Sequence, residues 1–103
     1  MLKVTYIVSK DALADITDIS FRYETGGGFL GERFLNDLYN ISLEKICSNP
    51  YAFRRFRRNS IIRRFVMKHF PYKIFYDSSA VPIKIIAVIH TSRSSRSIKR
   101  RLK

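Results

Sequence analysis

The second half of this chain has almost no acidic residues. Residues 53–103 hold fifteen Lys and Arg side chains and one carboxylate, Asp77, whereas residues 1–52 hold five cations and seven carboxylates. The net charge of +12 therefore originates in the second half of the chain. Soluble surfaces usually intersperse the two signs, so this asymmetry predicts an anionic partner such as nucleic acid, the ribosome or an acidic protein.

Cysteine, histidine and long apolar runs are also scarce. The single cysteine, Cys47, excludes an internal disulfide and a cysteine-rich zinc site, and we expect it to be a small buried side chain. The two histidines are far apart and give no ligand spacing, so we predict no metal and no cofactor. The longest apolar run, Ile85 to Ile89, is far shorter than the roughly 20 residues that span a bilayer. With no signal-peptide layout at the N-terminus, we expect a cytoplasmic protein without a membrane partner.

The composition nevertheless predicts a folded domain. Hydrophobic residues make up 46% of the sequence and aromatic residues 14%, which excludes a disordered chain. A length of 103 residues suffices for one modest core, so we expect a single domain over residues 1–103.

The first half predicts a strand and two helices. Residues 2–8 alternate in the manner of a strand, with Leu2, Val4, Tyr6 and Val8 on one face. Ser9 is suited to cap a helix with the apolar stripe Leu13, Ile16, Ile19 and Tyr23, ended by the glycines at 26–28. A second helix is expected from about Phe29 to the stop signal Asn49-Pro50, with the stripe Leu30, Phe34, Leu38 and Ile41, widened by Leu35 and Ile46. Two such helices with a short connection form an antiparallel hairpin.

Residues 51–60 combine four arginines with three aromatic residues. Arginine binds phosphate oxygens in pairs and stacks on rings, and basic residues interleaved with aromatics suit single-stranded nucleic acid. Alternatively, Tyr51, Phe53 and Phe56 pack inward and the arginines are only solvated. The sequence does not separate these two interpretations.

Three further strands are predicted at residues 61–68, 72–77 and 83–90. In the last of them, Ile83, Ile85, Ala87 and Ile89 are expected on one face, and Lys84, Ile86, Val88 and His90 on the other. No strand face is purely polar, so one face should pack on the helices and the other should be a concave, semi-apolar, basic surface. Residues 91–103 predict either a short helix or a mobile basic arm.

The predicted class is α+β. The element order is strand–helix–helix–strand–strand–strand, with a mostly antiparallel four-stranded sheet packed against the helical hairpin.

This order resembles the RelE/ParE toxin superfamily of bacterial type II toxin–antitoxin modules over essentially the whole chain. The matching segments are Val8-Ser9-Lys10 with Ala12 and Asp15, Arg33-Phe34 with Leu38, Asn49-Pro50, Ile62-Arg63-Arg64, residues 70–76 (FPYKIFY), and residues 86–90 (IAVIH) followed by Arg93. Individually these are weak, but their order and spacing are typical of the superfamily.

The resemblance implies a toxin that is neutralised in a hetero-oligomer by a small antitoxin with an acidic C-terminal segment. ParE-like members act on DNA gyrase, and RelE-like members cleave mRNA on the ribosome. The resemblance implies that the target is contacted by Arg63, Arg64, Arg93 and Arg96. In a nuclease, the implied catalytic residues are His90, Arg93 and Arg63. The implied contacts with the antitoxin are Leu30, Phe34 and Leu38.

The residues around His90 favour the ParE-like alternative. No aromatic residue or histidine follows His90, and the second half has no Glu, so a nuclease would lack a stacking group there and a carboxylate base other than Asp77. A non-toxic basic module that binds nucleic acid is the third alternative.

Overall fold

The computed structural model describes residues 4–102 and has the predicted order of elements. These are β1 (Tyr6–Val8), α1 (Lys10–Thr25), α2 (Leu30–Asn36), a π-helical segment η1 (Asp37–Ser42), α3 (Leu43–Ser48), β2 (Ile62–Val66), β3 (Tyr72–Asp77), β4 (Ile83–His90) and α4 (Arg96–Arg101). The α+β class is confirmed, and of the two alternatives for the C-terminal segment the short helix is present. Leu2, expected in the first strand, lies outside the described residues.

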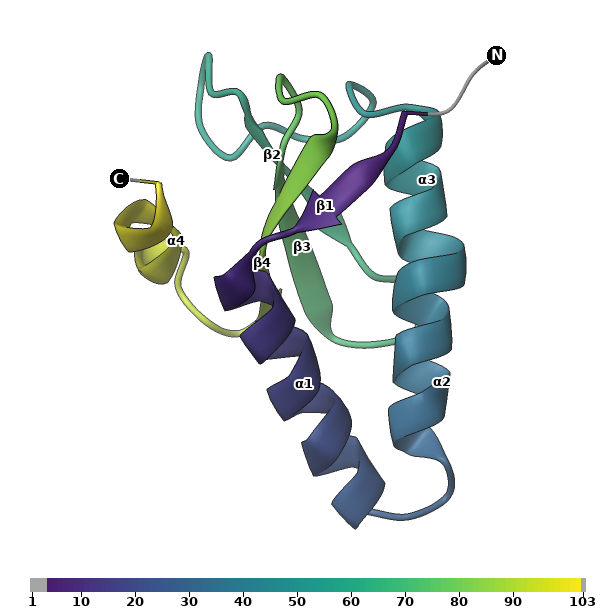
Figure 1. Cartoon of the computed structure of the whole chain (residues 1–103). Helices are drawn as coiled ribbons and strands as arrows, with labels where there is room; N and C mark the ends of the chain where they lie inside the picture. The colour runs from purple at the N-terminus through teal and green to yellow at the C-terminus, as the bar shows by residue number, and fades with distance from the viewer. Residues whose placement is uncertain (1–3, 103) are drawn as a thin grey trace.

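One four-stranded sheet organises the chain, in the order β1-β4-β3-β2. The β2–β3 and β3–β4 pairs are antiparallel, and β1 pairs in parallel with β4. The parallel pair requires a crossover between its strands, and the helical hairpin lies between β1 and β2 in the chain (Figure 1). The prediction of a mostly antiparallel sheet is therefore confirmed.

Helix α1 begins at the predicted cap. The Ser9 hydroxyl accepts a hydrogen bond from the Ala12 N–H at 3.1 Å. Ile16 and Ile19 are buried as expected, but Leu13 is 52% exposed and the fully buried Ala12 takes its place. The expectation for Leu13 is wrong because Ala12, four residues before Ile16, is the position that faces the core. Beyond the helix, Gly27 and Gly28 have φ values of 79° and 70°, which glycine adopts without penalty.

Segments α2, η1 and α3 form one continuous helical column beside α1 (Figure 1). The wider turn of η1 shifts the apolar stripe by about one residue. Phe34 and Leu38 are buried before the shift, whereas Leu43 and Ile46 are buried after it. Ile41 is consequently only half-buried, which corrects the predicted stripe.

The second helix ends at Ser48, next to the predicted stop signal. Asn49 has a φ of −152° and a ψ of 76°, so it does not adopt the left-handed conformation that asparagine tolerates at the end of a helix. The stop therefore follows from the inability of Pro50 to continue a helix.

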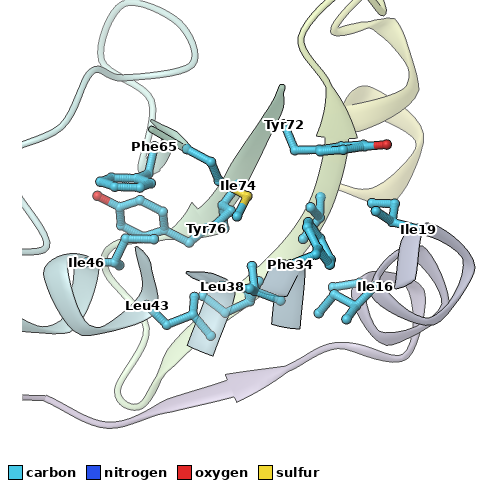
Figure 2. Close-up of a cluster of buried hydrophobic side chains, with 14 of the residues drawn as sticks. Ile16, Ile19, Phe34, Leu38, Leu43, Ile46, Phe65, Tyr72, Ile74 and Tyr76 are labelled. Atoms are coloured by element: carbon cyan, nitrogen blue, oxygen red, sulfur yellow. The ribbon is translucent and has the colours of Figure 1, made fainter. Parts of the chain in front are cut away.

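The helical hairpin packs on one face of the sheet and forms the larger of two cores, which we call the helix-side core (Figure 2). Its helical members include Ile16, Ile19, Phe34, Leu38, Leu43 and Ile46; its sheet members include Phe65, Tyr72, Ile74, Tyr76, Ile83, Ile85 and Val88. Tyr6 and Val8 pack at its margin, as predicted for one face of the first strand.

A β-bulge in β4 changes which residues face the helices. Tyr76 pairs with Ile85, but the preceding Phe75 pairs with Ala87, so Ile86 is an extra residue in β4. The predicted alternation is therefore wrong beyond Ile86: Ala87 belongs to the opposite face with Ile86.

The opposite face of the sheet carries a smaller core, which we call the far-side core. It comprises Ile62, Phe75, Ile86, Ala87, Ile89 and Ile98, with Phe56 packed against them. Ile98 belongs to α4 and is fully buried, and Phe56 comes from the loop before β2. Because α4 and this loop contribute to the far-side core, the prediction of an open, concave basic surface is wrong over this part of the sheet.

Candidate functional site

The candidate site begins where β4 ends. His90 closes β4 and pairs with Tyr72, and their ring centroids lie 5.3 Å apart in an edge-to-face arrangement. The Ser92 N–H donates to His90 Nδ1 at 3.1 Å, so Nδ1 is an acceptor and the proton of the neutral ring lies on Nε2. This hydrogen bond within the turn after β4 orients the imidazole ring.

Two clefts meet at Arg93. One has a volume of about 300 Å³ and is lined by Asp18, Arg22, Tyr72 and His90, among others. The other, of about 310 Å³, is lined by Arg93, Ser94, Arg96 and Arg100, and all four of these side chains are exposed. Arg93 and Arg96, both expected to contact a target, therefore lie together in a cationic group. Arg100 belongs to the same group, and the sequence analysis did not single it out.

An ion pair between α1 and α4 fixes the position of the cationic group. Arg101 Nη1 and Nη2 donate to the two carboxylate oxygens of Asp15 at 2.6 and 2.9 Å. Arg101 Nη1 also donates to the Ile86 carbonyl, and the Val88 N–H donates to Asp15 at 3.0 Å. The ion pair therefore satisfies backbone groups at the β-bulge. Hydrogen bonding to Asp15 raises the pKa of the Arg101 guanidinium above its ordinary value.

Arg63 lies away from His90 and Arg93. It pairs with Tyr76, which pairs in turn with Ile85, and His90 is five residues further along β4. At roughly 3.3 Å per residue, this separation is about 16 Å along the strand alone. The three residues expected to act together in a nuclease do not converge.

The donors of Arg63 are engaged within the chain. Its Nη1 donates to the Phe53 carbonyl at 2.8 Å and its Nε to Ser78 Oγ at 3.3 Å. Its guanidinium also lies 5.3 Å from the centroid of the Tyr51 ring. Arg64 follows it in β2, is half-buried, and projects from the opposite face of the sheet.

A buried tyrosine lies behind Arg63. Tyr76 is fully buried and its hydroxyl donates to the Pro50 carbonyl at 2.6 Å. Burial raises the pKa of the Tyr76 phenol to about 12, although the nearby Arg63 acts in the opposite direction.

Two of the three residues expected to contact an antitoxin are in the core. Phe34 and Leu38 are fully buried, so neither offers a free surface, which corrects that expectation. Leu30 is partly exposed and lines a cleft of about 590 Å³ together with Arg33, His69 and Phe70. Apolar residues at steps of three or four share one face of a helix. This pattern is the same whether that face packs on the core of the protein or binds a partner, so the sequence alone does not distinguish the two.

The same cleft contains a polar pair that the sequence analysis did not identify. Asp37 begins η1, its side chain is 6% exposed, and its Oδ2 lies 2.8 Å from His69 Nδ1. Ser42 Oγ, also buried, donates to the other oxygen of Asp37 at 3.3 Å. His69 thus connects the β2–β3 turn to the helical column.

Residues 4–102 offer neither a cluster of metal ligands nor a helix suited to cross a membrane. They contain no group of three or more His, Cys, Asp or Glu side chains that could hold a metal ion. In the same part of the chain, no helix is long and apolar enough to cross a membrane.

Comparison with known proteins reveals a shared fold. No family model and no curated protein matches the sequence. Among solved structures, the chain is similar to one described as "Chromosomal ParDE TA system from P. aeruginosa", with a TM-score of 0.62 and 16% identity. The match covers 87% of this chain and 98% of the other. The fold of this protein is therefore also found in a chain of a ParDE toxin–antitoxin system.

Proposed function

We propose that this protein is the toxin of a type II toxin–antitoxin pair, of ParE type, and that it inhibits growth through DNA gyrase. The observation that carries the proposal is the likeness to a chain of a ParDE system, which extends over 87% of this chain and 98% of the other. The independent resemblance of the sequence motifs to the superfamily supports the same assignment.

The proposed target surface is the exposed arginine group at the C-terminal end. Arg93, Arg96 and Arg100 line one cleft, and Arg64 adds a half-buried cation on the far side of the sheet. The planar guanidinium of arginine matches the geometry of both carboxylates and phosphates, so this group suits an enzyme that is itself bound to DNA. Arg63 is better placed to support the loop before β2 than to contact a target.

The proposed antitoxin is a small protein with an acidic segment. The partly exposed Leu30 and the exposed Arg33 offer an apolar and a cationic contact in the cleft at α2, which the exposed Glu32 and the buried Asp37 also line. An amphipathic acidic segment would meet both. A toxin–antitoxin affinity that did not weaken with added salt would count against the cationic contribution.

An mRNA endonuclease is the second candidate, because His90 and Arg93 line one cleft. A general base or acid and a phosphate-binding cation are two of the groups that metal-independent RNA cleavage needs. The third group expected for that site, Arg63, does not lie there.

Two assays on the purified protein test the proposal. In a DNA supercoiling assay we expect gyrase inhibition that Arg93→Gln/Arg96→Gln abolishes and that Lys10→Gln/Lys45→Gln, which removes the same charge elsewhere, does not. In a translation extract followed by primer extension, discrete cuts only in translated message would overturn the gyrase proposal in favour of the endonuclease. Absence of growth arrest on expression would overturn both and leave the non-toxic nucleic-acid-binding module.

A further inference from the structure

The loop before β2 carries a second cationic surface, distinct from the group at Arg93. We call it the arginine loop (residues 51–60). Arg54, Arg55, Arg57 and Arg58 are all exposed. In the part of the chain that the structure describes, none of the four forms an ion pair with a carboxylate. Its cations are therefore available to an outside ligand.

The arginine loop is anchored on both faces of the sheet. Phe53 packs edge-to-face on Phe65 of the helix-side core, with ring centroids 4.9 Å apart. Phe56 packs in the same way on Phe75 of the far-side core, at 5.7 Å. The loop thus straddles the edge strand β2, and its two aromatic anchors leave the intervening arginines outside.

Backbone hydrogen bonds hold the loop along β2. The Arg64 N–H donates to the Arg54 carbonyl at 2.9 Å, and the Phe56 N–H donates to the Ile62 carbonyl at 2.8 Å. An isolated antiparallel bridge joins Arg55 to Arg63. Because the backbone is fixed in this way, binding a ligand costs less ordering than it would on a mobile basic tail.

An exposed aromatic ring completes the surface. Tyr51 is 64% exposed, and the guanidinium of Arg63 lies 5.3 Å from its ring centroid. Arg63 is itself held by Phe53 and Ser78, so it supports the ring. Exposed aromatic rings beside cations are the elements on which unpaired bases stack in single-strand binders.

We propose that the arginine loop binds single-stranded nucleic acid, with Arg54, Arg55, Arg57 and Arg58 on phosphates and Tyr51 stacked on a base. The cations are all arginine, whose planar fork matches phosphate oxygens. The exposed ring among these cations offers a stacking face for any unpaired base. This surface goes beyond the proposed toxin function and does not depend on it.

The test uses the full chain and fluorescein-labelled twelve-nucleotide oligo-dT and oligo-rU, with binding followed by anisotropy at several salt concentrations. The variant Arg54→Gln/Arg55→Gln/Arg57→Gln/Arg58→Gln removes four phosphate contacts. Each contact contributes about 0.7 to the salt slope for a single strand, so the fall in affinity between about 50 and 200 mM salt should shrink by roughly 50-fold. The matched control Lys10→Gln/Lys45→Gln/Lys68→Gln/Lys84→Gln removes the same charge from scattered exposed positions and should leave most of the slope.

Tyr51→Ala tests the stacking step separately. Loss of one stacked base should weaken single-strand binding by roughly 5- to 150-fold without changing the salt slope, and should not weaken binding of a duplex. Phe21→Ala, at a ring that is 67% exposed on α1, is the control and should leave affinity unchanged. An equal loss of oligonucleotide affinity in the arginine and lysine variants would overturn the proposal. So would competition by polyglutamate for the labelled oligonucleotide that is as strong as competition by unlabelled oligo-dT. The second outcome would assign the loop to an acidic protein.

Discussion

Breaking the ion pair between Arg101 and Asp15 should weaken the attachment of α4 to the rest of the fold. The side chains of Arg101 and Asp15 are 23% and 18% exposed, which places this ion pair between the surface and the interior. Exposed pairs contribute about 0–1 kcal/mol, and breaking a buried pair costs about 3–5 kcal/mol. We therefore expect Arg101→Gln to lower the free energy of unfolding by about 2 kcal/mol, or the Tm by about 8–16 °C.

Urea denaturation followed by circular dichroism measures this effect, and a double-mutant cycle isolates the ion pair. Asp15→Asn retains an oxygen that can accept from the Val88 N–H, so the cycle with Arg101→Gln reports mainly on the interaction with Arg101. The matched control is Arg22→Gln. Arg22 lies 2.6 Å from Asp18 in α1, but both side chains are more than half exposed, and its loss should cost no more than about 0.5 kcal/mol.

A coupling energy near zero would refute this reasoning. So would equal destabilisation by Arg101→Gln and Arg22→Gln, because burial would then not govern the strength of the two pairs. Either result would mean that Ile98, which is fully buried in the far-side core, holds α4 without help from the ion pair.

Three further changes test other parts of the fold. His69→Ala leaves the buried carboxylate of Asp37 without its imidazole partner and should cost about 1–3 kcal/mol in urea denaturation, whereas Ala at the exposed neighbour Lys68 should have little effect. The pKa of Tyr76 is raised from 10.0 to about 12 on folding, so its contribution to stability is complete below pH 10 and is lost as the pH rises through 12. Burial also raises the pKa of Tyr6 and Tyr23, so the Tyr76 phenol is identified by difference: tyrosinate absorbance should show a group that titrates near pH 12 and is missing in Tyr76→Phe. Titration of every tyrosine near pH 10 in the folded protein would contradict this. Gly31→Ala places a Cβ 2.9 Å from the Ser20 carbonyl oxygen, so it should separate α1 from α2 and destabilise the protein by about 1–3 kcal/mol despite the better helix propensity of alanine; an unchanged or raised Tm would disprove that close contact.

The parts of the fold that follow from local chemistry could be predicted from the sequence. The Ser9 cap, the glycine turn and the helix end before Pro50 each depend on neighbouring residues, and all three lie where they were expected. Strand β3 likewise spans the predicted residues 72–77, because a short run of β-branched and aromatic residues favours a strand.

The errors arise where one extra residue changes the register. The bulge at Ile86 reverses the faces of the last part of β4, and η1 rotates the stripe after Leu38. Neither has a signal in the sequence as strong as a proline or glycine. The expectation that Phe34 and Leu38 contact a partner has a related cause: an apolar stripe on a helix has the same sequence pattern whether the sheet or another chain covers it.

The site contacts that the sequence analysis missed join residues far apart in the chain. Asp15 and Arg101 are separated by 86 positions, and Asp37 and His69 by 32. Only the folded backbone brings such pairs together, so the spacing of residues in the sequence predicts neither pair.

The use of carboxylates within the fold explains why the arginines are left for a partner. Asp15, Asp18 and Asp37 are each paired with a cation or histidine of this chain. Asp77, the one carboxylate of the second half, accepts hydrogen bonds from Ser79 and Ala80 in its own turn. Within residues 4–102, none of the arginines of the arginine loop or of the group at Arg93 forms an ion pair with a carboxylate, and bringing each surface to an anionic ligand relieves the mutual repulsion of its cations. Because the two surfaces are built on different elements, substitutions in one should leave the other intact, which allows their partners to be identified independently.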